Sequence, residues 1–144
     1  MRKTRAYVAA ATLLVAFQPA VAEDKSAVVS WETLSKVSVT RQKDRYVPEF
    51  SKEIVALDKR EVKLKGFMMP LEVGLTQKRF LLIAQPPECA FCMPGSPEQM
   101  AEVLAKVPVK LPSDAIIVSG TFSLLRDDSG GLLYRLTEAV VVNR

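Results

Sequence analysis

Two cysteines supply the most reactive chemistry in this chain. Cys89 and Cys92 are its only cysteines, and they are spaced Cys-x-x-Cys. Thiols at this spacing can bind a soft metal ion, close a disulfide or exchange disulfides with another protein. They lie within residues 85–99, which also hold four of the nine prolines, so we expect a stiff loop.

The chain contains no histidine. This absence excludes Ser-His-Asp and Cys-His nucleophilic catalysis, histidine metal ligands and histidine pH switches. The carboxylates show no spacing that indicates acid–base catalysis, and there is no glycine-rich phosphate loop. We therefore expect a protein that is not an enzyme, unless the two thiols themselves catalyse.

The first hypothesis is a metal-binding loop. Cys89 and Cys92 would supply two thiolates, and Met93, Met68 and Met69 are candidate thioether donors. This set fits copper(I) better than zinc, because copper(I) accepts two sulfurs and tolerates thioethers. For the methionines, packing in the core is the competing role, since Met fills irregular gaps. The corresponding function is metal handling.

The second hypothesis is a non-catalytic interaction or adaptor domain. A disulfide between Cys89 and Cys92 would clip the loop into a rigid recognition surface, as suits an exported chain. Four further side chains would contribute to that surface or to a bound ligand: Glu88, Phe91, Glu98 and Gln99. The two glutamates would also be available to complete a zinc site.

The third hypothesis is a thiol–disulfide oxidoreductase, because a strand, Cys-x-x-Cys and a helix describe a thioredoxin-like motif. Ser96-Pro97-Glu98-Gln99 predicts a helix that starts with Ser96 as N-cap. The apolar face of this helix would be formed by Met100, Val103, Leu104 and Val107. Its start lies four residues beyond Cys92, too far to lower a thiol pKa strongly, which disfavours this hypothesis.

The N-terminus predicts an export signal that is cleaved after Ala22, with a basic head, an apolar run over 7–17 and a small-x-small site. The run is shorter than the roughly 20 residues of a spanning helix, so we expect no transmembrane segment in the mature chain. Removing the signal lowers the formal charge from +4 to +1, because three of the 20 basic and none of the 16 acidic residues lie in it. Nucleic-acid binding is therefore not expected.

Periodicity predicts strands in the rest of the chain. The strand segments are 61–71, with a bend at Gly66, the apolar run 79–84, and an antiparallel hairpin of 116–124 and 132–142. Residues 51–56 suit a short helical turn. We expect a mainly β chain with one or two short helices, folded as a small five-stranded OB-like antiparallel barrel with the Cys-x-x-Cys loop at its mouth.

The expected domains are a signal peptide over 1–22, an N-terminal arm over 23–50 and the barrel over 51–144.

From about Trp31 onward, the chain resembles the bacterial exported family named domain of unknown function 3299. The order and spacing of four blocks carry the resemblance: Gly66-Phe67-Met68-Met69-Pro70-Leu71, Phe80-Leu81-Leu82-Ile83, the segment from Cys89 to Gln99, and Val118-Ser119-Gly120.

Members of that family look like small periplasmic proteins or lipoproteins, often associated with transporter genes and in some cases linked to metal supply. The resemblance implies a periplasmic location, with a transporter or another periplasmic protein as partner. In many relatives a histidine follows the cysteine closely, whereas Phe91-Cys92 stands there in this chain. The replacement of one metal ligand type by another suits a metal site, but it disfavours zinc and leaves a disulfide open.

Overall fold

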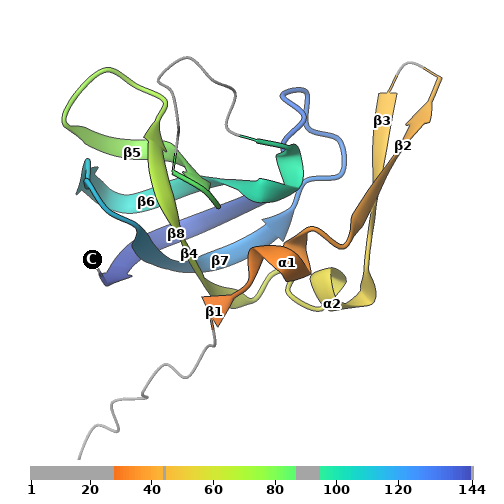
Figure 1. Ribbon diagram of the computed structural model, residues 1–144, viewed down its shortest axis with the longest axis horizontal. Helices are drawn as coiled ribbons and strands as arrows, with labels where there is room; N and C mark the ends of the chain where they lie inside the picture. Colours follow the sequence, from red (N-terminus) through yellow and green to blue (C-terminus); the bar gives the residue numbers. More distant parts are fainter. Residues whose placement is uncertain (1–27, 44, 87–94, 144) are drawn as a thin grey trace, which may run out of the picture.

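Five strands form a closed barrel in the computed structural model, which describes residues 28–43, 45–86 and 95–143 (Figure 1). The strands are β4 (Glu61–Pro70), β5 (Thr76–Ile83), β6 (Met100–Lys110), β7 (Ile116–Leu124) and β8 (Tyr134–Asn143). They pair in the order β4-β5-β6-β8-β7, and a further pairing between β4 and β7 closes the sheet. The predicted mainly β fold with a five-stranded barrel is confirmed.

The pairing has the order first, second, third, fifth, fourth, as in an OB barrel. The barrel pairs are antiparallel except β6 and β8, which run parallel. Residues 61–66 of β4 pair with β7, and residues 67–70 pair with β5, so the strand changes partner at Gly66. A Cβ there would lie 2.6 Å from the carbonyl oxygen of Ile83, so only glycine allows this close approach.

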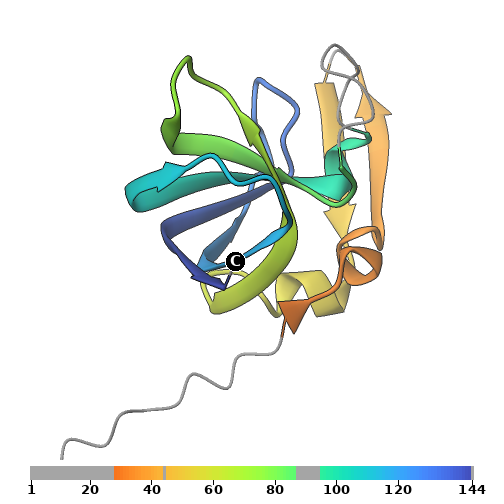
Figure 2. The ribbon, with the colours of Figure 1, turned by 60° about the vertical axis from the view of Figure 1, so that its left-hand side comes forward.

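The N-terminal part of the described chain packs against the barrel (Figure 2). It comprises β1 (Val28–Val29), α1 (Trp31–Leu34), a hairpin of β2 (Val37–Gln42) and β3 (Arg45–Phe50), and α2 (Lys52–Val55). The serines before the two helices accept a hydrogen bond from the first turn, and α2 confirms the helical turn predicted over 51–56. Leu34 and Ile54 are fully buried in the barrel core.

Aromatic side chains fill the core beside α1. Tyr134 stacks on Phe122 with ring centroids 5.4 Å apart, and its hydroxyl donates a hydrogen bond of 2.6 Å to the carbonyl oxygen of Leu34. Burial, together with the negative charge of Glu98, raises the pKa of the Tyr134 hydroxyl far above its usual value. This hydroxyl therefore stays protonated and joins β8 to α1.

A second apolar cluster lies outside the main core. Leu81, Ile83 and Met100 are buried there, with Phe67, Met69 and Leu132 packed against them. Ile83 pairs with both Phe67 and Met100, and Leu81 pairs with Met69 and Glu102, so these residues form two cross-strand rows. We call this the outer cluster.

The prediction that a helix begins after Ser96 is wrong. Only one 3₁₀ turn, η1 (Pro97–Gln99), follows Ser96, and Met100 already has extended backbone angles at the start of β6. The Ser96 hydroxyl donates 2.7 Å to Glu98 Oε1 and makes no cap bond to the backbone. Barrel pairing therefore overrides the local helix signals, and Pro108 is tolerated because β6 has an irregular register beyond Leu104.

Among the described residues, no helix has the length and apolar character needed to span a bilayer.

Candidate functional site

A groove of about 580 Å³ lies between the β2–β3 hairpin and the 125–133 loop that joins β7 to β8. Figure 1 shows the hairpin standing beside the barrel, with this loop, drawn in blue, rising next to it. The groove is lined by Val39, Arg45, Pro48, Pro97, residues 125–129 and residues 131–133. Its surface is mainly apolar, with charged side chains among the lining residues.

Among the described residues, the hairpin contacts the main core through the side chains at its base. Val37 pairs with Phe50, and both contact the main core. Two residues further along each strand, Val39 pairs with Pro48 on the same face of the hairpin, because side chains alternate along a strand. This second pair lines the groove instead of the core.

Charged side chains bridge the two walls. Arg45 Nη1 lies 3.8 Å from Asp127 Oδ2, and the guanidinium of Arg126 lies 5.4 Å from the ring centroid of Phe50. The Arg45 and Asp127 side chains are 71% and 80% exposed, so this ion pair contributes about 0–1 kcal/mol. A ligand that enters the groove can separate the pair at little cost.

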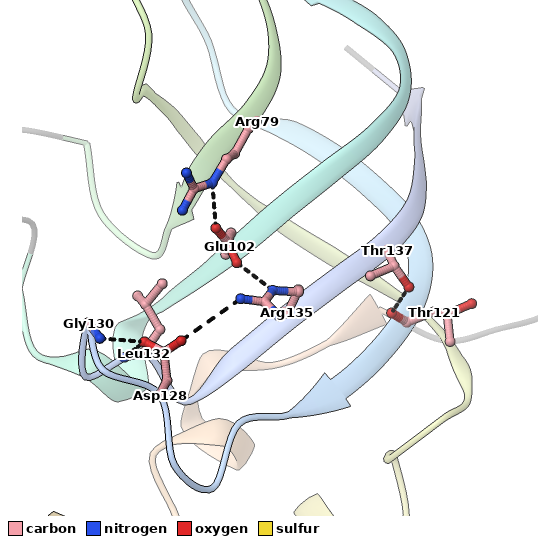
Figure 3. Close-up of polar contacts among 8 residues, drawn as sticks. All are labelled: Arg79, Glu102, Thr121, Asp128, Gly130, Leu132, Arg135 and Thr137. Atoms are coloured by element: carbon pink, nitrogen blue, oxygen red, sulfur yellow. Dashed lines mark hydrogen bonds and ion pairs between the residues drawn. The ribbon is translucent and has the colours of Figure 1, made fainter.

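The 125–133 loop is ordered by one carboxylate (Figure 3). Asp128 Oδ2 accepts hydrogen bonds from the backbone N–H groups of Gly130, at 2.9 Å, and Leu132, at 3.1 Å. The N–H of Leu125 donates 2.8 Å to the carbonyl oxygen of Leu133 and closes the base of the loop. The groove wall is thus fixed by its own sequence before any ligand binds.

A buried carboxylate connects this loop to the outer face of the barrel. Glu102 on β6, with a side chain only 2% exposed, accepts a 2.6 Å hydrogen bond from Arg79 Nε on β5 and another from Arg135 Nε on β8. Arg135 Nη2 in turn lies 3.9 Å from Asp128 Oδ1. Figure 3 shows these contacts as one continuous path from Arg79 to the 125–133 loop.

The electrostatics keep Glu102 ionised. Burial favours the neutral acid, but the hydrogen bonds and charges of Arg79 and Arg135 outweigh that effect and lower the pKa of Glu102. The charged pairs are strong because the carboxylate is shielded from water. Glu102 therefore fixes Arg135, which helps to fix Asp128 beside the groove.

The two methionines predicted as helpers at a metal site lie on opposite faces of β4. Met68 is buried in the main core, and Met69 packs on the outer cluster. Adjacent residues of a strand point to opposite faces, so at most one of them can approach an ion held on either side. For Met68, core packing is the observed role.

Five predicted site residues lie outside the described residues: Glu88, Cys89, Phe91, Cys92 and Met93. Glu98 and Gln99 are described and belong to η1, next to Pro97, which lines the groove. Both backbone polar groups of Gln99 are hydrogen-bonded. Its N–H donates to the carbonyl oxygen of Ser96, and its carbonyl oxygen accepts from the N–H of Ala84. Within the described ranges, no three His, Cys, Asp or Glu side chains gather as a metal site.

Sequence reasoning missed the groove and the Glu102 cluster. Arg79, Glu102 and Arg135 lie on three strands and are brought together by their register alone. A signal did exist, because Glu102 lies within the apolar run 100–105. If this run forms a buried strand, the carboxylate of Glu102 needs a cationic partner. On the predicted helix, Glu102 would instead have faced the solvent, so no partner was sought.

Comparisons with known proteins identify a family. The family described as "Protein of unknown function (DUF3299)" matches residues 14–141. The crystal structure of a DUF3299 family protein from Pseudomonas aeruginosa PAO1 is similar, with a TM-score of 0.52 and 25% sequence identity, over 67% of this chain and 68% of that chain. No curated protein matches the chain.

Proposed function

The chain belongs to the DUF3299 family of proteins of unknown function, and we propose that it is a non-catalytic adaptor domain. Its ligand is a segment of a partner polypeptide that binds between the β2–β3 hairpin and the 125–133 loop. The observation that carries this proposal is the groove of about 580 Å³, a size within the roughly 300–1,000 Å³ range of ligand sites.

The walls of the groove suit an extended peptide. The β2–β3 sheet has only two strands, so each strand leaves one edge without a strand partner among the described residues. An extended segment can pair with such an edge and place alternate side chains against Val39 and Pro48. The charged residues Arg45, Arg126 and Asp127 would then select polar groups of the segment.

In-cell photo-cross-linking tests the adaptor role. A photoreactive amino acid replaces Val39 in the groove or, as a matched control, Val142 on β8, because these residues are 48% and 46% exposed. The proposal predicts a discrete cross-linked protein from position 39 that is absent from position 142. It also predicts that Leu132→Asp, which puts a charge into the groove wall, removes that product. Equal cross-linking from both positions would refute it.

A soft-metal site at Cys89 and Cys92, with Met93 as a further donor, is the second candidate function. It is supported by the position of Met69, which lies in the outer cluster with Ile83 and Met100, the residues that end β5 and begin β6. Copper(I) suits this donor set better than zinc. We expect the reduced protein to take up one copper(I) ion, and Cys89→Ser to abolish uptake. Retained binding by Cys89→Ser/Cys92→Ser would exclude the site.

Both functions suit an exported protein that works with a transporter or another periplasmic protein. Osmotic-shock fractionation tests the location, because the processed chain should start at Glu23 and appear in the periplasmic fraction. The mass of the untreated protein separates the two states of Cys89 and Cys92, since a disulfide lowers it by two hydrogens. An oxidoreductase role would require a thiol with a low pKa. Such a thiol would be alkylated faster than free cysteine.

A further inference from the structure

The loop between β4 and β5, at the upper left of Figure 1, carries apolar side chains that are exposed to solvent. Within residues 71–75, Val73 is fully exposed, Leu75 is 76% exposed and Leu71 is 43% exposed. Leu111, also exposed, lies next to this loop, because its N–H donates 2.9 Å to the carbonyl oxygen of Leu75. We call Leu71, Val73, Leu75 and Leu111 the apolar tip.

A buried glutamine holds the apolar tip in shape. Gln77 has no exposed surface, and its Oε1 accepts a hydrogen bond of 3.1 Å from the N–H of Glu72. Its Nε2 donates 2.9 Å to the carbonyl oxygen of Glu72 and 3.1 Å to that of Gly74. The amide thus satisfies three backbone groups of one five-residue loop. The apolar side chains are therefore displayed from an ordered backbone, which lowers the entropic cost of binding.

Basic side chains flank the apolar tip. Gln77 pairs with Val109, and both are buried, so the alternating neighbours Lys78 and Lys110 face outward. Neither lysine has an ion-pair partner among the described residues, whereas Lys106 lies 3.5 Å from Glu138. Two acidic residues are also nearby, Glu72 in the loop itself and Asp114 in the loop that follows Leu111, and no ion pair among the described residues joins either of them to Lys78 or Lys110. Both ammonium groups are therefore available to an anionic surface.

We propose that the apolar tip docks on the surface of a lipid bilayer that contains anionic headgroups. Leu71, Val73 and Leu75 enter the apolar boundary, while Lys78 and Lys110 contact the headgroups. A second copy of the chain is the poorer occupant, because a two-fold contact between identical tips brings the same lysines together. A bilayer instead satisfies the apolar and the basic groups at once.

Vesicle co-sedimentation tests the proposal. The purified protein is mixed with vesicles of phosphatidylcholine alone or of phosphatidylcholine and phosphatidylglycerol in equal amounts. We expect binding to the anionic vesicles that weakens as salt is added, because salt screens the lysine contacts. Val73→Asp/Leu75→Asp should weaken this binding at least about tenfold, since it removes two side chains that bury apolar surface. Lys78→Glu/Lys110→Glu should weaken it on anionic vesicles only.

Val55→Asp is the control, because Val55 is an exposed valine on α2, outside the tip. Every variant keeps the same N-terminal segment, so any lipid affinity of that segment cancels in the comparison. Far-UV circular dichroism verifies that the exposed substitutions leave the fold intact. The proposal is overturned if the unaltered protein does not bind anionic vesicles. It is also overturned if Val73→Asp/Leu75→Asp binds as well as Val55→Asp, or if that double variant abolishes only self-association.

Discussion

Replacing Glu102 by glutamine tests whether the buried cluster orders the barrel and its groove. The substitution keeps the shape of the side chain and removes its charge. Two charge-assisted hydrogen bonds, from Arg79 and Arg135, become weaker. Each of these hydrogen bonds is worth about 1.5–3 kcal/mol when the carboxylate is intact. The loss is smaller than their sum for two reasons. The Arg79 side chain is 56% exposed and can bond water instead, and the oxygen of the new amide can still accept one hydrogen bond. We therefore expect a loss of about 2–3 kcal/mol in the free energy of unfolding at pH 7.

The stabilisation by Glu102 should depend on pH, because its carboxyl group must be ionised to bind the two arginines. The folded-state pKa of Glu102 lies below the ordinary value of 4.5, so the ionised side chain stabilises the fold fully above that value. As the pH falls from about 4.5 through the lowered folded-state pKa, this contribution is lost. Urea unfolding of both proteins between pH 7 and pH 3 should show a constant stability difference above about pH 5 that narrows below it.

Glu138→Gln is the matched control, because Glu138 also binds a cation, Lys106, but is 73% exposed. We expect it to cost no more than about 1 kcal/mol. If Glu102→Gln costs no more than Glu138→Gln, or if its stability difference does not change with pH, the cluster does not have the stabilising role assigned here.

Three further substitutions test the packing. Gln77→Ala should cost about 1–3 kcal/mol in urea unfolding and speed hydrogen exchange in residues 71–75, because three backbone groups lose their partner; unchanged exchange would contradict this. Gly66→Ala should lower the melting temperature, because its Cβ would meet the carbonyl oxygen of Ile83 at 2.6 Å, and overpacking costs about 1–3 kcal/mol. Tyr134→Phe should cost about 1–2 kcal/mol and expose α1 to protease, and full protease resistance would argue against that link.

The barrel could be predicted because its strands carry period-two patterns. Val62 and Leu64 alternate with charged residues, and both are buried in the core. The turn chemistry at 127–131 also predicted the antiparallel pairing of β7 and β8, which their register confirms. Local alternation and turn residues were sufficient for these elements.

Strand β6 could not be predicted in the same way. Met100, Ala101, Glu102 and Val103 are all buried, because this part of β6 is covered on both faces, so the alternation disappears. Ser96-Pro97 then supplied a helix-start signal that the fold uses for a single 3₁₀ turn. Tertiary pairing with β5 and β8 decided the outcome.

The candidate groove depends on contacts between distant segments. Val39 and Leu132 are separated by most of the domain, and neither belongs to a motif. The sequence instead directed attention to Cys89 and Cys92, whose chemistry is specific but whose positions lie outside the described residues. The charged path from Arg79 to Asp128 likewise becomes visible only when the register of three strands is known.

The most direct test of the adaptor role is an NMR titration of the isotope-labelled protein with a synthetic peptide. The peptide is taken from the partner that cross-links through position 39. We expect the changes in backbone amide chemical shift to concentrate in residues 37–50 and 125–133, on the two walls of the groove. Leu132→Asp should remove these changes. Shifts confined to other parts of the barrel, or none at saturating peptide, would contradict the groove as the binding site.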